Sequence, residues 1–148
     1  MDSYTLYLLL ADDDEDDQML FHEALKELPV ESRLVTVKDG VQLMAMLLEP
    51  DMAWPDIIFL DLNMPKKTGM ECLAEIKQDE RLRQLPVVIY STSFIPDLIN
   101  ELYDTGAHYY IRKPGEFAKL KRSIHNAISR TQEDKAARPA REHFVIQP

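Results

Sequence analysis

Four short apolar runs in this sequence each end on a polar residue. They cover residues 5–11, 57–60, 87–90 and 109–112, and they are followed in turn by Asp12 and Asp13, Asp61, Ser91 and Lys113. Short apolar runs bounded by turn residues are typical of buried strands. If these strands lie parallel, their carboxyl ends meet at one edge of the sheet, where open α/β sheets hold their functional sites. We therefore expect three carboxylates, a hydroxyl and an ammonium to share one pocket.

Strand-like and helix-like segments alternate along the chain. The patterns predict strands over 5–11, 33–37, 56–60, 87–90 and 107–112, and helices over 15–28, 41–49, 68–84, 96–104 and 116–130. Such alternation favours a doubly wound α/β fold, in which a five-stranded parallel sheet carries helices on both faces.

Length and composition indicate one ordinary globular domain. The chain has 148 residues, of which 45% are apolar and 29% charged. A net charge of −9 argues against nucleic acid and against anionic membrane surfaces as partners. The longest apolar run is far shorter than a membrane span and the N-terminus lacks a signal-peptide pattern, so we expect a cytoplasmic protein. The single cysteine, Cys72, excludes an internal disulfide and fits a buried thiol.

The last part of the chain differs from the rest. Residues 131–148 are polar, contain two prolines, and include the short apolar stretch 144–146. We expect a domain over 1–130 and a C-terminal tail over 131–148. The apolar stretch is too short to fold alone; it could add as an edge strand or dock on a neighbouring molecule. A loose terminus is an equally open alternative.

Six consecutive acidic residues, 12–17, follow the first predicted strand. Grouped carboxylates repel one another, so a pocket that holds several ionised ones needs a cation. Oxygen-only ligation suits Mg²⁺, and we expect Asp12 and Asp13 to bind it. Asp14 is a natural N-cap for the following helix, and Asp16 and Asp17 are interpreted as favourable charges at the helix start.

A calcium-binding EF-hand loop is a weaker interpretation of the same acids. Positions 1, 3, 5 and 12 of such a loop would be Asp12, Asp14, Asp16 and Glu23. Position 6, however, is Asp17 and not the glycine that the sharp turn requires. The loop would also interrupt the helical pattern of residues 19–28.

Asp61, Ser91 and Lys113 have side chains suited to phosphoryl transfer. A carboxylate can attack phosphorus and form an aspartyl phosphate. A serine hydroxyl can donate a hydrogen bond to one phosphoryl oxygen, and a lysine ammonium can neutralise another. Each residue alone could equally be a turn aspartate, a strand-end serine or a surface lysine. Their common position at strand ends favours one shared site.

The motifs around these residues match a known family. They are LLLADDDEDD at 8–17, FLDLNMPKKTGME at 59–71, VVIYSTS at 87–93 and GAHYYIRKP at 106–114. With them the chain resembles a response-regulator receiver domain over about residues 4–130. It looks most similar to the single-domain regulators that serve bacterial phytochrome-type kinases. The resemblance implies a flavodoxin-like fold with strand order 2-1-3-4-5.

The resemblance implies that Asp61 is the phosphoacceptor. It also implies a Mg²⁺ site made by Asp12, Asp13, Asp61 and the backbone carbonyl of Asn63.

Three further roles follow from the same resemblance. Ser91 matches the switch hydroxyl of the family, although serine is less frequent there than threonine. Tyr110 falls at the position of the aromatic switch residue. Lys113 matches the lysine that contacts the phosphoryl group, and its bond to Pro114 is expected to be cis.

The expected partner is a sensor histidine kinase or a phosphotransfer protein, which would donate the phosphoryl group from a phosphohistidine. We expect a signalling protein and not an enzyme, with slow hydrolysis of its own aspartyl phosphate at most. The fourth helix, the fifth strand and the last helix form a candidate homodimer face.

Two alternatives remain open at this point. A phosphatase of the haloacid-dehalogenase type would use Asp12 as nucleophile and Asp14 as general acid, but it needs an acidic pair after the lysine. Only Glu116 follows Lys113 closely. The second alternative is a receiver-like scaffold that is never phosphorylated.

Overall fold

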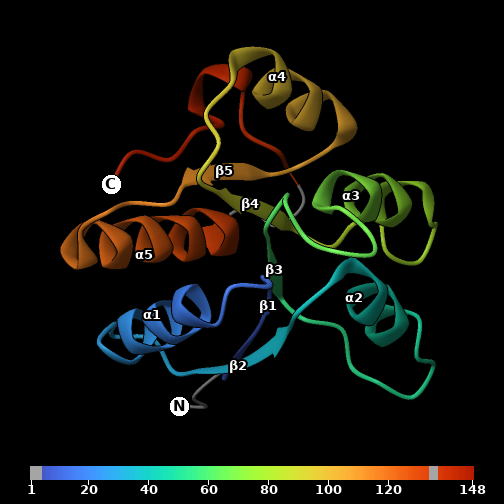
Figure 1. Ribbon diagram of the computed structural model, residues 1–148, viewed down its shortest axis with the longest axis horizontal. Coiled ribbons are helices and arrows are strands. Elements are labelled where there is room, and N and C mark those ends of the chain that lie inside the picture. The colour runs from blue at the N-terminus through green and yellow to red at the C-terminus, as the bar shows by residue number, and fades with distance from the viewer. Residues whose placement is uncertain (1–4, 134–136) are drawn as a thin grey trace.

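The protein forms one parallel sheet covered by helices on both faces (Figure 1). The structure is a computed structural model and describes residues 5–133 and 137–148. The strands are β1 Leu6–Ala11, β2 Ser32–Val37, β3 Ile57–Leu60, β4 Val87–Ser91 and β5 Tyr109–Arg112. Their order in the sheet is β2-β1-β3-β4-β5 and all neighbouring pairs are parallel. The predicted fold class and strand order are confirmed.

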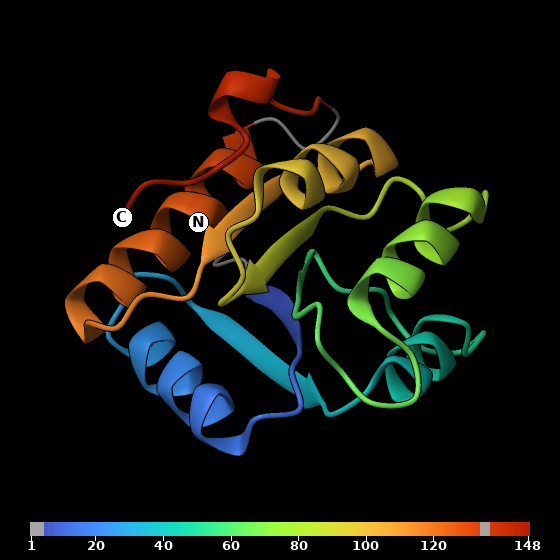
Figure 2. The same cartoon turned by 45° about the horizontal axis from the view of Figure 1, so that its top comes forward.

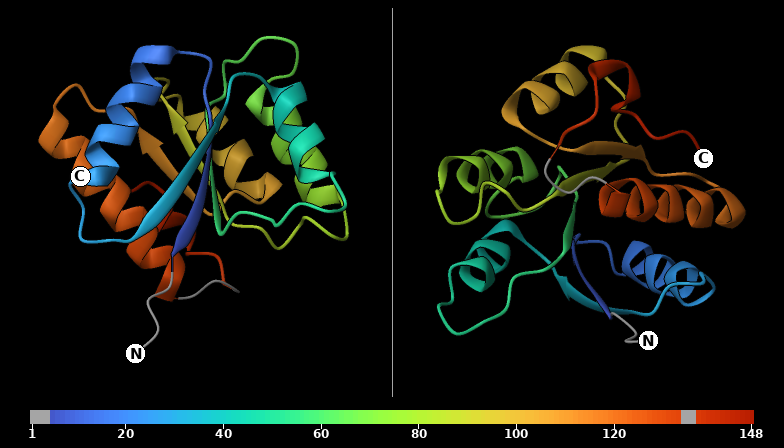
Figure 3. Two further views of the ribbon diagram at one scale, coloured as in Figure 1. Left: turned by 90° about the horizontal axis from the view of Figure 1, so that it is seen from below. Right: turned by 180° about the vertical axis from the view of Figure 1, so that it is seen from behind.

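The helices divide into two layers. They are α1 Glu15–Lys26, α2 Gly40–Leu47, α3 Gly69–Gln78, α4 Pro96–Thr105 and α5 Phe117–Glu133, and a short 3₁₀ helix, η1, covers Arg141–His143. Helices α1 and α5 lie on one face of the sheet, while α2, α3 and α4 lie on the other (Figures 1 and 3). Within the described ranges, no helix has the length and apolar character needed to cross a membrane.

Burial explains why three of the strands are continuously apolar. Strands β1, β3 and β4 are buried along their whole length, because helices cover both of their faces. Strand β2 lies at the edge of the sheet and is only partly buried. The apolar side chains form two cores, one between the sheet and α2–α4 and one between the sheet and α1 and α5.

Side-chain caps start three helices close to strand ends. Asp14 accepts a hydrogen bond from the Asp17 amide and begins α1, as predicted. Asp39 caps α2, and Thr68 with Glu71 forms a capping box at α3. Each cap satisfies amide groups that the first helical turn leaves unpaired.

Helix α3 is shorter than the sequence pattern predicts. We expected a helix to Gln84, but α3 ends at Gln78, and Asp79 has an extended backbone with φ −86° and ψ 123°. The Asp79 carboxylate accepts a hydrogen bond from the Arg81 amide, which competes with helix continuation. The Lys77 ammonium donates to the carbonyl oxygens of Arg83 and Leu85 and stabilises the turn that follows.

The C-terminal tail pairs with the edge of the sheet. Val145 forms an isolated parallel bridge with Tyr110 of β5, so the apolar stretch adds at the edge of this chain's own sheet (Figure 2). Phe144 packs in the α2–α4 core and Ile146 in the α1–α5 core. Helix α5 also continues past the expected boundary at Arg130, to Glu133. Residues 134–136 of the expected tail lie outside the described residues.

Candidate functional site

The predicted site residues lie at the carboxyl ends of four neighbouring strands. Asp12 follows β1, Asp61 follows β3, Ser91 ends β4, and Lys113 follows β5. Hydrogen bonds continue the sheet across this edge: the Asp61 amide donates to the carbonyl oxygen of Ala11 at 2.9 Å, and the Lys113 amide to that of Ser91 at 2.8 Å. Backbone hydrogen bonds therefore hold together the strand ends that carry the predicted site residues.

The Lys113 ammonium lies among three carboxylates. Its Nζ is 2.8 Å from Asp12 Oδ2, 2.8 Å from Asp17 Oδ2 and 3.5 Å from Asp61 Oδ2. Asp12 and Asp61 are buried. One cation thus offsets several negative charges beside two buried carboxylates, where such interactions are stronger than on the surface.

Asp12, Asp13 and Asp61 form a group that could hold a metal ion. One carboxylate oxygen from each lies within 4.8 Å of the others. Asp13 is exposed, so the group is open to solvent on one side. An all-carboxylate donor set is the kind that hard cations such as Mg²⁺ or Mn²⁺ prefer. The amide of Asn63 also faces the group, with its nitrogen 3.5 Å from Asp61 Oδ1. The three carboxylates fit the predicted ion, and the Asn63 carbonyl stays a predicted ligand.

Burial shifts the pKa values of the pocket carboxyl groups. Desolvation raises the pKa of Asp61 to about 6, although the positive charge of Lys113 partly offsets it. Desolvation also raises the pKa of Asp12, again against the effect of Lys113. Burial disfavours the charged form of Lys113, but its hydrogen bonds to Asp12 and Asp17 outweigh this, so its pKa lies above the usual range. The lysine is therefore a permanent cation in the pocket.

The loop after Asp61 folds back against the site. Lys66 has a positive φ of 68°, and the Gly69 amide donates to the carbonyl oxygen of Leu62 at 3.0 Å. A Cβ atom at Gly69 would lie 2.1 Å from the carbonyl oxygen of Asp61. Only glycine allows the start of α3 to approach this closely.

Ser91 and Tyr110 are joined through the loop that follows β4. The amide of Ser93 donates to Ser91 Oγ at 3.2 Å, and the Tyr110 hydroxyl donates to the carbonyl oxygen of Ser93. Both Ser91 and Tyr110 are fully buried. The structure thus connects Tyr110 to the loop that follows Ser91.

Two features of the site differ from the sequence interpretation. Asp17, expected to be a helix-start charge, contacts Lys113 directly. Its position in the first turn of α1, close to the acidic pair in the sequence, was the only available signal. The prediction of a cis bond between Lys113 and Pro114 is wrong. No peptide bond in the described residues is cis. Gly115, where an added Cβ would meet no atom within 4 Å, follows in this loop.

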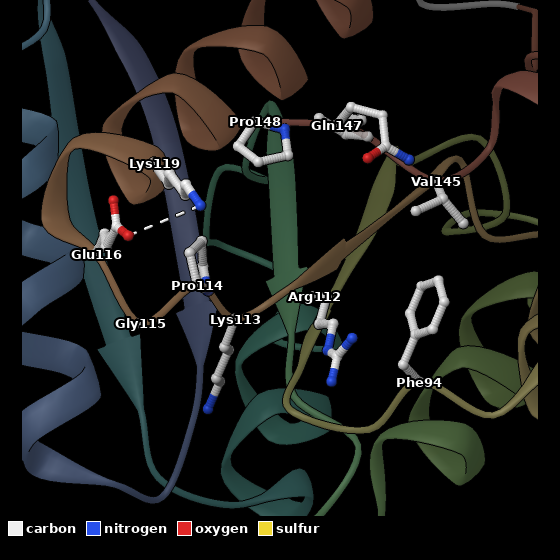
Figure 4. Close-up of a pocket in the computed structure, with 11 residues that line it drawn as sticks. Phe94, Arg112, Lys113, Pro114, Gly115, Glu116, Lys119, Val145, Gln147 and Pro148 are labelled. Atoms are coloured by element: carbon white, nitrogen blue, oxygen red, sulfur yellow. Dashed lines mark ion pairs between the residues drawn. The ribbon is translucent and has the colours of Figure 1, made fainter.

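A second hollow lies next to the site, between β5, the start of α5 and the tail (Figure 4). It has a volume of about 640 Å³, and its lining includes Phe94, Arg112, Lys119 and the chain end at Pro148. Lys113 also lines it, while Asp12, Asp13 and Asp61 do not. A salt bridge joins Lys119 to Glu116, and both residues line this pocket (Figure 4).

The parallel sheet, the acidic group and the lysine at its carboxyl edge are the arrangement expected of a receiver domain. Residues 8–125 match the family model described as "Response regulator receiver domain". The chain therefore belongs to this family, whose members act in two-component signal transduction. This membership favours the receiver over the phosphatase alternative.

Among its relatives, phytochrome response regulators are prominent. Response regulator Rcp1 of Synechocystis sp. is 37% identical over 110 residues, which cover 72% of this chain and 75% of Rcp1. The structure of the phosphorylated cyanobacterial phytochrome response regulator RcpA is 38% identical, with a TM-score of 0.78, and the match covers 93% of this chain and 100% of RcpA. A Mn²⁺-bound form of Rcp1 is 32% identical, with a TM-score of 0.76, over 91% of this chain and 99% of that one. The predicted similarity to phytochrome-type regulators is confirmed.

Proposed function

We propose that Asp61 accepts a phosphoryl group from a phosphohistidine on a sensor histidine kinase or a phosphotransfer protein. The observation that carries this proposal is the Lys113 ammonium 3.5 Å from Asp61 Oδ2, beside the metal-binding group of Asp12 and Asp13. A solved relative, RcpA, is described as phosphorylated.

The chemistry follows from the charges in the pocket. The Asp61 carboxylate attacks phosphorus, an O–P bond forms, and the N–P bond to the donor imidazole breaks with its electron pair going to the nitrogen, which takes up a proton. The attacking group must be ionised, so a pKa of about 6 leaves Asp61 largely competent at neutral pH. Lys113 neutralises charge that develops on the phosphoryl oxygens.

A divalent ion is part of the proposal. Asp12, Asp13, Asp61 and the backbone carbonyl of Asn63 would hold Mg²⁺. When bound, Mg²⁺ supplies Lewis-acid neutralisation of the transferring phosphoryl group. Support comes from the carboxylate donors that lie within 4.8 Å of one another and from a relative described as Mn²⁺-bound.

Signalling would pass through protein contacts. In this proposal the Ser91 hydroxyl turns toward the phosphoryl group and Tyr110 responds, because the Tyr110 hydroxyl donates to the Ser93 carbonyl in the same loop. Such a change is a population shift between two states that one local charge biases. The surface of α4, β5 and α5 is the proposed contact face for a partner or a second copy.

Intact-protein mass after incubation with acetyl phosphate tests the proposal. We expect one added phosphoryl group in the wild type with Mg²⁺, little without Mg²⁺, and none in Asp61→Asn. Asp97→Asn, the same substitution at an exposed position at the start of α4, should label like the wild type. An adduct that survives in Asp61→Asn would place the nucleophile elsewhere. The absence of an adduct from wild type, both with acetyl phosphate and with a phosphorylated histidine kinase, would favour an unphosphorylated scaffold.

A further inference from the structure

Asp17 has a contact that no assigned role explains. Its Oδ2 lies 2.8 Å from Lys113 Nζ, as close as Asp12 and closer than the 3.5 Å contact to Asp61. An ammonium has three N–H donors. In this pocket the three donors face three carboxylates, two at short range and one at long range.

The backbone holds Asp17 in this position. Its amide donates to Asp14 Oδ1 at 3.0 Å, within the cap that begins α1. The Asp14 amide in turn donates to Asp12 Oδ1 at 3.0 Å. Asp12 and Asp17 are therefore parts of one short, hydrogen-bonded segment, and both reach the same ammonium.

Lys113 depends on such contacts for its position. Its side chain is 9% exposed, against 29% for Asp17 and none for Asp12. The lysine stem has four flexible carbon atoms, so the ammonium needs partners that hold it in one place. The Nζ atom also lies 5.0 Å from the centre of the Tyr90 ring. Asp17 is the only one of the three carboxylates that approaches the ammonium from a helix.

We propose that Asp17 is a positioning residue for phosphoryl transfer to Asp61, which rests on the proposed function above. The short bonds to Asp12 and Asp17 anchor the ammonium at two points. The third N–H, with its longer contact, then faces Asp61, where an oxygen of an arriving phosphoryl group can accept it while both anchors stay in place. Asp17 thus acts through Lys113 and need not touch the phosphoryl group.

A purely electrostatic role would have the opposite consequence. Asp17 adds negative charge near a site that receives an anion, so removing that charge alone should speed phosphorylation. Asp17→Ala and Asp17→Asn both remove the charge, but only the asparagine keeps an oxygen that can accept a hydrogen bond from Lys113. Positioning predicts a loss of rate in Asp17→Ala that Asp17→Asn partly rescues, whereas electrostatic repulsion predicts a gain in both.

The test is the rate of Asp61 labelling by acetyl phosphate with saturating Mg²⁺. We expect Asp17→Ala to slow labelling by about tenfold, inside the roughly hundredfold that misplacement of a reacting group can cost. Asp17→Asn should slow labelling clearly less than Asp17→Ala does. Asp16→Ala, which removes a neighbouring and exposed helix-start charge, should label at the wild-type rate and controls for weakening of α1.

A double-mutant cycle tests whether the effect passes through Lys113. In a Lys113→Ala background, Asp17→Ala should change the labelling rate by less than about twofold. A second readout needs no phosphoryl donor and no metal: the proton-exchange rate of the Lys113 ammonium in nitrogen-15 NMR spectra. It should rise in Asp17→Ala and stay near the wild-type value in Asp16→Ala.

The inference is overturned by faster labelling in both Asp17 variants, by an undiminished effect of Asp17→Ala without Lys113, or by an unchanged exchange rate of the ammonium. A wild-type protein that is never labelled at Asp61 would overturn the proposed function and this inference together. Normal wild-type labelling with unaffected Asp17 variants would overturn the inference alone.

Discussion

The amide of Tyr110 donates a 3.0 Å hydrogen bond to the carbonyl oxygen of Phe144, and the ring centres of the two residues lie 6.3 Å apart. The Ile146 amide returns a 2.9 Å bond to the Tyr110 carbonyl. Phe144 is fully buried, and its ring centre also lies 5.2 Å from that of Tyr103 on α4. The tail is thus part of the core beside the proposed switch residue.

Replacing Phe144 tests how much the docked tail stabilises the fold. We expect Phe144→Ala to lower the free energy of unfolding by about 3–5 kcal/mol, because truncating a buried aromatic ring loses apolar burial and leaves a cavity. Urea denaturation measures this change. Gln147→Ala, an exposed neighbour, should change stability little. A loss below about 1 kcal/mol in Phe144→Ala would mean that the tail does not stay docked in solution.

Asp61 should make the metal-free protein less stable as pH rises. Its folded-state pKa of about 6 lies above the ordinary value of 3.8, so the folded state holds this proton more tightly than the unfolded state. The stabilising contribution is complete below pH 3.8 and disappears as pH rises through 6. Asp61→Asn, which stays neutral, should therefore be more stable than wild type by about 1–3 kcal/mol at pH 7.5 without Mg²⁺. Denaturation curves at pH 5 and 7.5 measure the gain, which should be smaller at pH 5. If Asp61→Asn and the wild type were equally stable at both pH values, this would contradict a raised pKa of Asp61.

His108 should act in the opposite direction. Burial, with smaller effects of the Lys77 and Arg138 charges, lowers its pKa from 6.5 to about 4, and its buried Nδ1 has no hydrogen-bond partner among the described residues. The unfolded state then binds a proton between these values while the folded state does not. The contribution of His108 should therefore lower the free energy of unfolding by about 3 kcal/mol as pH decreases from 6.5 to 4.

The measurement for His108 compares pH profiles of unfolding free energy. His108→Met keeps the side-chain volume and removes the titrating ring. In this variant the free energy of unfolding should no longer show the part of the decrease at low pH that is due to His108. The difference between variant and wild type isolates it from Asp61, whose contribution has the opposite sign. Parallel profiles would show that His108 is not buried in its neutral form.

Mg²⁺ should stabilise the protein through the acidic group. At a concentration one hundred times its Kd, binding to the folded state alone adds about 2.7 kcal/mol to the free energy of unfolding. Asp13→Asn should weaken the binding, since Asp13 is the exposed member of the group. Thermal denaturation across a Mg²⁺ titration measures both, with Asp16→Asn as the matched change of an exposed acid outside the group. An equal response of Asp13→Asn and wild type would exclude Asp13 as a ligand.

Gly69 should tolerate no side chain. An added Cβ would meet backbone atoms of Asp61 and Leu62 at 2.1 and 2.8 Å, so the loop carrying Asp61 would have to move. We expect Gly69→Ala to cost about 1–3 kcal/mol or more in stability and to slow labelling of Asp61. Gly115→Ala, where a Cβ would have no neighbour within 4 Å, is the control, and similar behaviour of the two variants would contradict the close approach.

Local patterns predicted much of the fold and most of the proposed site. The apolar runs at β1, β3 and β4 are continuous because these strands are buried on both faces. Their ends identify Asp12, Asp61 and Ser91 directly. Helix ends were less predictable, and α3 stops at Asp79 because a side chain competes for backbone amides.

The sequence by itself determined which residues end the strands, because strand periodicity and turn chemistry are local properties of the chain. The contacts of Asp17 and Phe144 with residues distant in the sequence were decided only by the tertiary structure. Asp17 and Lys113 are 96 positions apart and meet because β1 and β5 end at the same edge of one sheet. Phe144 reaches Tyr110 because the chain after α5 returns to the free edge of β5. Such contacts depend on how the helices and strands pack together, and no local pattern encodes that packing.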